Sequence, residues 1–223
     1  MKQLPLPIVA PATARFETFM PGANAAAVQH LQQMGASAAP VYLWGPSGSG
    51  KTHLLRALAQ ARQDRGERVG WFDAGSRPPW RMEPSYTLLL LDACDRYDDA
   101  QQASAFALLV DAQAHGAGWV AAARVPPVDL TLREDLRTRL GWGPVFALHN
   151  LAEDQARAVL RRESDRRGIF LSDDVMDYLL TRFARDLSHL MALLDRLDGF
   201  ALSEHRGVTV PLLKKMLAEQ DAA

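Results

Sequence analysis

The sequence predicts an α/β fold, a parallel sheet flanked by helices, followed by a small all-helical domain. Up to residue 150, short apolar runs of strand type alternate with helical patterns at the spacing of β–α–β units. After Leu151 the strand-type runs stop and four helical patterns follow. A glycine-rich turn also separates the first strand pattern from the next helix, where parallel α/β sheets bind phosphates. We predict an extended arm over 1–14, an α/β domain over 15–150 and a helical domain over 151–223.

The arm is predicted to be extended because Pro5, Pro7 and Pro11 fix φ and disfavour helix. Composition favours an unstructured terminus over a short peptide that docks in a partner's apolar groove, and both interpretations stay open at this point. A signal peptide is not expected, because the segment carries one lysine and its apolar residues are interrupted by proline.

The elements of the α/β domain follow from apolar patterning and from capping residues. Asn24 is the expected N-cap of the first helix, and Gly66 the C-cap of the second. The apolar run that ends at Asp92 is typical of a strand buried on both faces. Three prolines and Trp80 make 75–84 an irregular loop. The predicted strands are 41–44, 68–72, 87–91, 119–123 and 145–148, and the predicted helices are 25–34, 52–65, 98–115 and 132–140.

The last part of the chain shows helical periodicity throughout. Ser172 and Thr209 are plausible N-caps, and Gly168 and Gly207 interrupt the pattern. The predicted helices are 153–167, 172–183, 186–203 and 209–219.

Composition excludes several classes of protein. The net charge of −1 gives no overall basic field, so strong non-specific binding to nucleic acid is not expected. The one cysteine, Cys94, rules out an internal disulfide and suits a reducing compartment. No apolar run is long enough to cross a bilayer. We therefore expect a cytoplasmic protein without membrane contact.

The glycine-rich turn fits the phosphate-loop pattern G-x-x-x-x-G-K-[ST] without substitution. Backbone N–H groups of such a loop cradle phosphate oxygens at the positive end of a helix. Lys51 would reach the β- and γ-phosphates, and the Thr52 hydroxyl would bind Mg²⁺. A chance Gly/Ser turn is the alternative, but the strand before and the helix after favour the phosphate loop. Its residues are Gly45, Pro46, Ser47, Gly48, Ser49, Gly50, Lys51 and Thr52.

Asp92 ends a buried strand at the edge where such sheets bind ligands, so we assign it to Mg²⁺ rather than to a simple turn. An ATPase of this type needs a second acid directly after that aspartate to orient the attacking water. Here the position is Ala93, and Asp95 and Asp98 lie too far along the chain. The site is predicted to bind nucleotide but to hydrolyse it poorly alone.

Two arginines, Arg137 and Arg139, precede a Gly-Trp-Gly turn. They either form a solvated helix end or present a guanidinium to the γ-phosphate of a neighbouring subunit. Residue types alone do not decide between these alternatives.

Taken together, these motifs resemble the AAA+ family related to the replication initiator DnaA. Phe16-Glu17-Thr18-Phe19, with Pro21-Gly22 and Asn24, is similar to the family's box that borders the adenine pocket. Gly45–Thr52 and Leu88–Asp92 match its Walker A and B elements, and 137–143 is similar to its arginine-finger box, with Arg139 at the finger position. The resemblance also implies that the four C-terminal helices form the AAA+ lid.

Within the family, the chain resembles the regulatory inactivators of DnaA. The given sequence has no helix-turn-helix segment after the four helices, unlike the initiator. Its arm, Gln3-Leu4-Pro5-Leu6-Pro7-Ile8, is similar to the Q-L-x-L-P-L peptide by which inactivators bind the sliding clamp, with contacts expected from Gln3, Leu4, Leu6 and Ile8. This resemblance overrides the compositional preference for an unstructured terminus.

The resemblance implies a mechanism between two molecules. The partners would be DnaA, the β sliding clamp and, through the clamp, DNA; a homo-oligomer is also allowed. ADP or ATP, with Mg²⁺, would bind the chain's own site, and ADP would stabilise the active form. Arg139 would complete the site of ATP-bound DnaA and trigger hydrolysis there, which prevents re-initiation. Nucleotide contacts are also expected from Phe19, His53 and Arg185.

Two positions depart from the family pattern. Ala122 stands where the sensor-1 element has a polar residue, and Ser188 stands at the usual sensor-2 arginine. Arg185, one helical turn earlier, is a possible substitute. Both departures suit a site that holds a diphosphate. The competing hypotheses are a self-sufficient DNA-dependent ATPase similar to a helicase loader, and an adaptor of the DnaA family without catalytic effect.

Overall fold

A computed structural model of the chain describes residues 14–35, 39–183, 187–204 and 207–221. These residues form two compact units, one that extends to His149 and one that begins at Asn150. In the described ranges no helix is both long and apolar enough to span a membrane.

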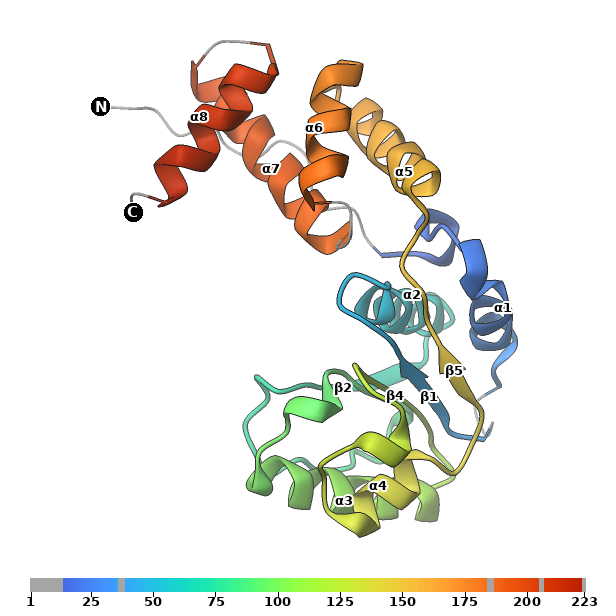
Figure 1. The fold of residues 1–223 in the computed structure, drawn as a ribbon. Helices are drawn as coiled ribbons and strands as arrows, with labels where there is room; N and C mark the ends of the chain where they lie inside the picture. The colour runs from blue at the N-terminus through green and yellow to red at the C-terminus, as the bar shows by residue number, and fades with distance from the viewer. Residues whose placement is uncertain (1–13, 36–38, 184–186, 205–206, 222–223) are drawn as a thin grey trace. The chain divides into compact units, whose positions relative to one another are not determined.

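The α/β unit is built on a five-stranded sheet in which every neighbouring pair of strands is parallel (Figure 1). The strand order is β2-β3-β4-β1-β5, so the strand that precedes the phosphate loop lies between β4 and the edge strand β5. The strands are β1 (Val41–Trp44), β2 (Arg68–Phe72), β3 (Tyr86–Leu91), β4 (Gly118–Ala123) and β5 (Val145–Ala147).

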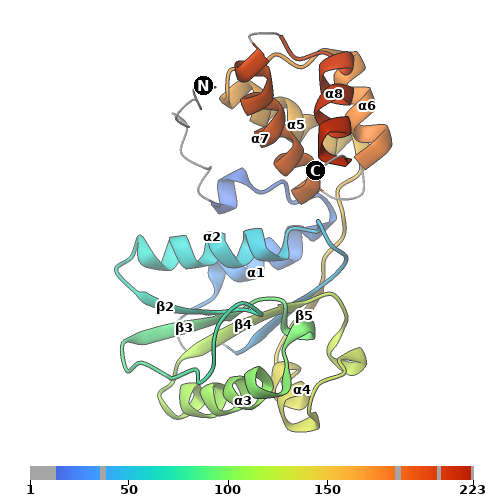
Figure 2. The same cartoon turned by 90° about the vertical axis from the view of Figure 1, so that its left-hand side faces the viewer.

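Helices cover both faces of this sheet, as Figure 2 shows. One face carries α1 (Ala25–Gln33) and α2 (Lys51–Gln63), and the other carries α3 (Asp99–Ala114) and α4 (Glu134–Leu140). Short 3-10 turns lie at Phe16–Thr18, Gly22–Asn24, Cys94–Arg96 and Pro127–Asp129. The predicted α/β class is therefore confirmed.

The continuous apolar runs are explained by two separate cores. Leu88 and Leu90 of β3 pack with α1 and α2, whereas Leu89 and Leu91 pack with α3 and α4. Side chains alternate between the faces of a strand, and a strand covered on both sides must be apolar at every position. All four leucines are 0–1% exposed. The same requirement explains the run Trp119–Ala123 in β4.

Arg62 is a buried charged residue on α2, on the face of the sheet that α1 and α2 cover. Its side chain pairs with Glu67 at 2.8 Å and donates to the carbonyl oxygens of Met34 and Gly35, and it is 2% exposed. The guanidinium therefore ties the end of α1 to the α2–β2 connection.

Two capping predictions need correction. The side chain of Asn24 does not cap α1; it donates to the carbonyl oxygen of His149 at 2.9 Å and accepts from its N–H at 2.8 Å. Asn24 instead joins the start of α1 to the segment after β5. Helix α2 ends at Gln63 with Asp64 as C-cap, and Gly66, at φ +79°, lies in the turn beyond.

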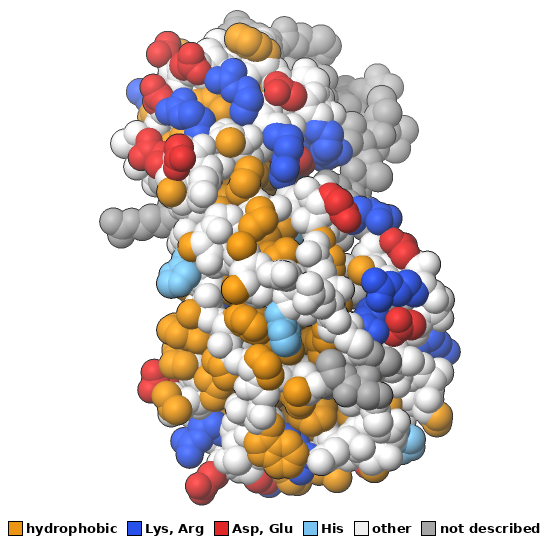
Figure 3. Space-filling model, turned by 90° about the vertical axis from the view of Figure 1, so that its right-hand side faces the viewer, with side chains coloured by type: hydrophobic (Ala, Val, Ile, Leu, Met, Phe, Trp, Pro, Cys, Tyr) orange, Lys and Arg blue, Asp and Glu red, His pale blue; other side chains and the backbone are white. Residues whose placement is uncertain are grey.

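Figure 3 shows the face of the α/β unit over α1 and β5, where hydrophobic and uncharged side chains gather. The sequence accounts for this surface. No Asp, Glu, Lys or Arg occurs between Glu17 and Lys51, nor between Arg139 and Glu153.

The helical unit packs four helices around an apolar core. Thr209 Oγ1 accepts from the N–H of Leu212 at 3.4 Å, as expected of the residue that caps the last helix. The helices are α5 (Glu153–Arg166), α6 (Asp173–Phe183), α7 (Leu187–Glu204) and α8 (Val210–Asp221).

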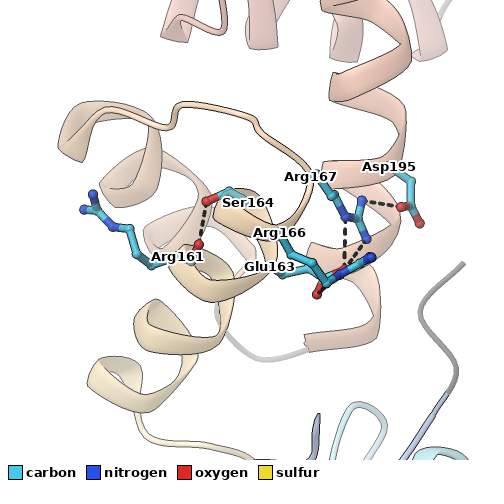
Figure 4. A network of polar contacts seen from close by, with 6 residues as sticks. All are labelled: Arg161, Glu163, Ser164, Arg166, Arg167 and Asp195. Atoms are coloured by element: carbon cyan, nitrogen blue, oxygen red, sulfur yellow. Dashed lines mark hydrogen bonds and ion pairs between the residues drawn. The ribbon is translucent and has the colours of Figure 1, made fainter. Parts of the chain in front are cut away.

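A polar network on α5 joins this helix to α7 (Figure 4). The Glu163 carboxylate accepts from Arg166 and from Arg167, and Arg167 also pairs with Asp195 on α7. The Arg166 guanidinium, followed by that of Arg167, lowers the pKa of Glu163 despite its partial burial. These arginines are bonded within the unit, and we assign them a structural role.

Candidate functional site

The phosphate loop has the backbone that its glycines permit. Gly45, Gly48 and Gly50 have φ of +153°, +78° and +92°, a region where side chains with a Cβ are strained. A Cβ on Gly45 would lie 2.2 Å from the carbonyl oxygen of Leu148, and one on Gly50 would lie 2.4 Å from the Phe19 ring. Two of the three glycines are thus required by close contacts as well as by φ.

Lys51 is the first residue of α2, directly after Gly50. Its ammonium donates to the carbonyl oxygens of Gly45 and Pro46, both at 2.7 Å, and to Ser49 Oγ at 3.3 Å. The positive charge is therefore held at the loop itself. A bound phosphate would be met by this charge and by the amino end of α2.

The two predicted metal ligands lie in contact. Thr52 Oγ1 donates to Asp92 Oδ2 at 2.6 Å, and Asp92 Oδ1 accepts from the N–H of Ala93 at 2.9 Å. In the ranges that the structure covers, no cluster of three His, Cys, Asp or Glu residues could hold a metal alone. One hydroxyl and one carboxylate fit Mg²⁺, which usually takes its other ligands from phosphates and water.

The predicted adenine-pocket residues gather beside the loop. The Phe19 and His53 rings lie 5.5 Å apart, centroid to centroid. His53 Nε2 lies 3.1 Å from the Arg15 carbonyl oxygen and 3.3 Å from Thr18 Oγ1. His53 thus joins the 3-10 turn before Phe19 to the first turn of α2, and the two predicted nucleotide-binding residues lie in contact there.

The acidic residues that follow Asp92 make other contacts within the chain. Ala93 has φ +52°, a left-handed conformation that is uncommon for a residue with a Cβ. Asp95 accepts from Arg124 Nε at 2.6 Å, and Asp98 accepts from the N–H of Gln101 at the start of α3. Neither carboxylate is available to orient a water at the Ala93 position, and Ala122 of β4 is fully buried.

Cys94 offers no alternative chemistry at this edge. The residue is fully buried, and this burial raises the pKa of its thiol to about 12. A neutral thiol at neutral pH is a poor nucleophile.

Several predicted site residues lie outside the described part of the chain. These are the clamp-binding residues Gln3, Leu4, Leu6 and Ile8, and the sensor-2 substitute Arg185. For Ser188 the structure describes the backbone only. Their assignments remain predictions.

Arg139 lies at the end of α4 with its guanidinium against aromatic rings. Nη1 donates to Gln113 Oε1 of α3 at 2.6 Å, and the guanidinium carbon lies 4.5 Å from the Trp142 ring centroid and 5.4 Å from that of Phe106. Nε is buried, and it has no hydrogen-bond partner among the described residues. Arg137 makes none of these contacts, so the structure distinguishes the two arginines, which residue types alone left equivalent and of which the resemblance selected Arg139.

The surface around Arg139 is hollowed. An open hollow of about 730 Å³ is lined by residues of α3, of α4 and of the positions that flank α4: Phe106, Arg133, Glu134, Asp135, Thr138, Arg139 and Trp142. Trp142 is 52% exposed. A guanidinium with an aromatic floor at the wall of an open hollow is suited to meet an anionic group from outside.

Arg139 and the phosphate loop lie at opposite ends of the strands: the loop at the carboxyl edge of the sheet and Arg139 at the amino edge. The loop follows the carboxyl end of β1, whereas Arg139 precedes the amino end of β5, and these two strands are parallel. The turn after α4 touches the residue before β1: a Cβ on Gly143 would lie 1.7 Å from the carbonyl oxygen of Pro40. Arg139 is therefore not part of the site formed by its own loop.

Sequence reasoning did not find Gln113 as the partner of Arg139 or Arg124 as the partner of Asp95. Each pair is more than 25 residues apart along the chain. Their contacts arise from how α3 packs beside α4 and how β4 lies beside β3. No local sequence motif predicts contacts between residues so far apart along the chain.

Comparisons with known proteins identify the family of the chain. Residues 153–217 match the family model described as Hda, lid domain, and residues 12–75 match that of the bacterial DnaA ATPase domain. The chain is 31% identical to an uncharacterized protein of Haemophilus influenzae, over 97% of this chain and 98% of that one.

Solved structures show a similar fold. Domain III of the replication initiation protein DnaA from Thermotoga maritima has a TM-score of 0.78 at 19% identity, with 94% of this chain and 97% of that chain covered. DnaA from Aquifex aeolicus, bound to AMPPCP, has a TM-score of 0.67 at 21% identity, with 87% and 69% covered.

Proposed function

This chain belongs to the DnaA- and Hda-related AAA+ proteins, and from that premise we propose that it is a negative regulator of replication initiation. In this proposal it supplies Arg139 to the nucleotide site of ATP-bound DnaA, and DnaA then hydrolyses its ATP and becomes inactive.

The observation that carries the proposal is the separation of Arg139 from the chain's own phosphate loop. The two lie at opposite edges of one parallel sheet. An arginine at the wall of an open hollow on the far edge can meet a triphosphate only across an interface between two molecules. Hydrolysis in a partner also explains why the position after Asp92 can be Ala93, since the water-orienting acid would come from DnaA.

The expected gain is large. A guanidinium that neutralises charge on the transferring phosphoryl group accelerates hydrolysis by roughly 10³ to 10⁵. Such electrostatic stabilisation is strongest when the donors are fixed before the reaction begins. One arginine is therefore enough to convert a slow partner ATPase into a fast one.

The chain's own pocket would act as a binding site rather than a reaction site. Lys51, Thr52 and Asp92, which lie at the loop, would supply the contacts that hold phosphates and Mg²⁺. Ala93 and Ala122 lack the groups that hydrolysis and γ-phosphate sensing use. We propose that ADP occupies the pocket and stabilises the form that binds DnaA.

The arm would recruit the protein to the clamp on DNA. Gln3 can hydrogen-bond at the rim of a groove, and Leu4, Leu6 and Ile8 can enter it. Replacement of Gln3 and Leu4 with alanine is expected to abolish clamp binding and to leave ADP affinity unchanged. Retained clamp affinity in a pull-down would remove the arm from the proposal.

The test of the function is turnover by defined mixtures. The purified chain alone should hydrolyse little ATP, and hydrolysis should rise when DnaA and clamp-loaded DNA are added. Arg139→Ala should abolish the rise, whereas Arg137→Ala, from the same helix, should leave most of it. Brisk hydrolysis by the chain alone would favour a self-sufficient ATPase. An unchanged lifetime of DnaA-bound ATP in every mixture would favour an adaptor.

A further inference from the structure

We propose that Gln113 and Trp142 are positioning residues that hold the Arg139 guanidinium ready before the partner arrives. The inference rests on the proposed function, because it assigns the groups that prepare Arg139 for that role.

The two side chains constrain different directions. Gln113 Oε1 accepts from Nη1 at 2.6 Å and so fixes the guanidinium within its own plane. The Trp142 ring, with its centroid 4.5 Å from the guanidinium carbon, supports one face of that plane. The orientation of the guanidinium within its plane is thus defined by a residue of α3, and the position of one face by a residue of the turn after α4.

This arrangement leaves donors for a ligand. A guanidinium carries five N–H donors, of which Gln113 takes one and the buried Nε–H is unavailable. The remaining donors on Nη1 and Nη2 are enough for a two-point contact with phosphate oxygens. Because Gln113 is neutral, it orients the arginine without cancelling the positive charge that the triphosphate requires.

The contacts of Arg139 differ from those of Arg62, a buried arginine with a structural role. Arg62 is buried against a carboxylate and two carbonyl oxygens, which neutralise and satisfy it. Arg139 has no carboxylate partner among the residues described, and its buried Nε lacks an acceptor. An unsatisfied buried donor costs stability, so a purely structural residue here would be better apolar. The cost is explained if the guanidinium serves a ligand outside the chain.

Fixing the side chain beforehand has a kinetic consequence. A free arginine loses most of its rotamer freedom when it docks on a phosphate, and this loss slows the step that uses it. A side chain that is already restrained loses less. The effect should therefore fall on the rate within the complex rather than on the affinity between the two proteins.

The kinetic experiment measures hydrolysis of DnaA-bound ATP against the concentration of this chain, with clamp-loaded DNA present. Gln113→Met keeps the length of the side chain but removes the acceptor, and we expect the maximal rate to fall about tenfold. The half-saturating concentration should stay within about twofold, because the contact is internal to the chain. Asp111→Ala, an exposed change on the same helix, is the matched control and should leave both quantities unchanged.

Trp142 is tested by a pair of variants. Trp142→Leu removes the aromatic face and should lower the maximal rate by about the same factor as Gln113→Met, whereas Trp142→Phe should retain most of the rate. A maximal rate that is unchanged in Gln113→Met and Trp142→Leu would overturn the inference. A rise in the half-saturating concentration alone would also overturn it, because that result would indicate that the altered residue contacts the partner. A faster maximal rate would overturn it too, because that result would indicate that the residue holds Arg139 away from its working position.

A second measurement needs no partner. In the free protein labelled with ¹⁵N-arginine, the Arg139 Nε–H should exchange slowly and give a sharp signal, and Gln113→Met should broaden it. If the Arg139 signal stays sharp in Gln113→Met and the maximal rate of hydrolysis is unchanged, the positioning role is overturned but the proposed function is left intact. If Arg139→Ala itself has no effect on hydrolysis, both the proposed function and the inference fail.

Discussion

At the carboxyl edge of the sheet, Lys51 and Asp92 are bonded to the loop and to Thr52. At the amino edge, Arg139 contacts one neutral side chain and two aromatic rings. The first region contains the residues proposed to hold a nucleotide and has alanine at the position of the acid that would activate water. The second contains the cation that, in the proposed function, assists hydrolysis in DnaA. In that proposal each region is half of an ATPase site, and the two halves lie at opposite ends of the strands of one sheet.

The comparison indicates that, if the proposed function holds, one AAA+ unit carries its nucleotide-binding residues and its catalytic arginine at separate places. A parallel sheet fixes the loop after β1 and the turn before β5 at opposite edges, so neither can move to complete the other. Two molecules are then needed to join the halves. This view predicts that changes in one region leave the other region's property intact.

The largest expected effect comes from Arg139→Ala. Stimulated hydrolysis should fall by roughly 10³ to 10⁵, while ADP affinity and the midpoint of thermal unfolding stay near those of the unaltered chain. Single-turnover assays and a fluorescent ADP titration measure the two properties. A parallel loss of ADP affinity would show that the regions are coupled, contrary to the comparison.

Arg62→Ala separates loss of fold from loss of function. The carbonyl oxygens of Met34 and Gly35 would lose their donor, so the free energy of unfolding should fall by about 2–4 kcal/mol, measured by urea denaturation. Arg65→Ala, an exposed change near the end of the same helix, should lie within about 0.5 kcal/mol of the unaltered chain. Equal stability of the two variants would contradict the contacts assigned to Arg62.

Lys51→Ala should weaken ADP binding by roughly 30- to 150-fold, as expected for loss of a charged hydrogen bond worth about 2–3 kcal/mol. The ¹⁵N signal of Arg139 in the free protein should not change, because that side chain belongs to the other edge. Arg56→Ala, from the exposed side of α2, is the control for the affinity measurement.

The smallest effect is expected at Ala93. Its φ of +52° is less strained for glycine, so Ala93→Gly should stabilise the fold by about 0.5–1 kcal/mol. Ala103→Gly, at an exposed position inside α3, should destabilise it by about 1 kcal/mol. A higher midpoint of thermal unfolding for Ala93→Gly and a lower one for Ala103→Gly would support the left-handed conformation of Ala93. A lower midpoint for both variants would contradict it.

Much of the α/β unit was predictable because its signals are local. The runs of β3 and β4, the loop pattern at 45–52 and the final aspartate of β3 each lie within a few consecutive residues. The fold class and the contact of Thr52 with Asp92 follow from such runs and from the rule that parallel strands end at one edge.

The parts that were not predicted depend on contacts between distant segments. Asn24 was expected to cap α1 but bonds to His149 instead, and Asp95 is taken by Arg124. Family resemblance selected Arg139 over Arg137, but the contacts that surround Arg139 required the positions of α3 and the turn after α4. A periodic pattern gives the face of a helix, not the partner that packs on it.

The central claim is that Arg139 acts on ATP held by another molecule. The most direct measurement loads labelled ATP on DnaA and unlabelled ADP on this chain, removes free nucleotide, and follows label conversion after mixing with clamp-loaded DNA. The account predicts rapid conversion of DnaA-bound label with the unaltered chain and none above background with Arg139→Ala. Equal conversion with both forms of the chain would contradict it.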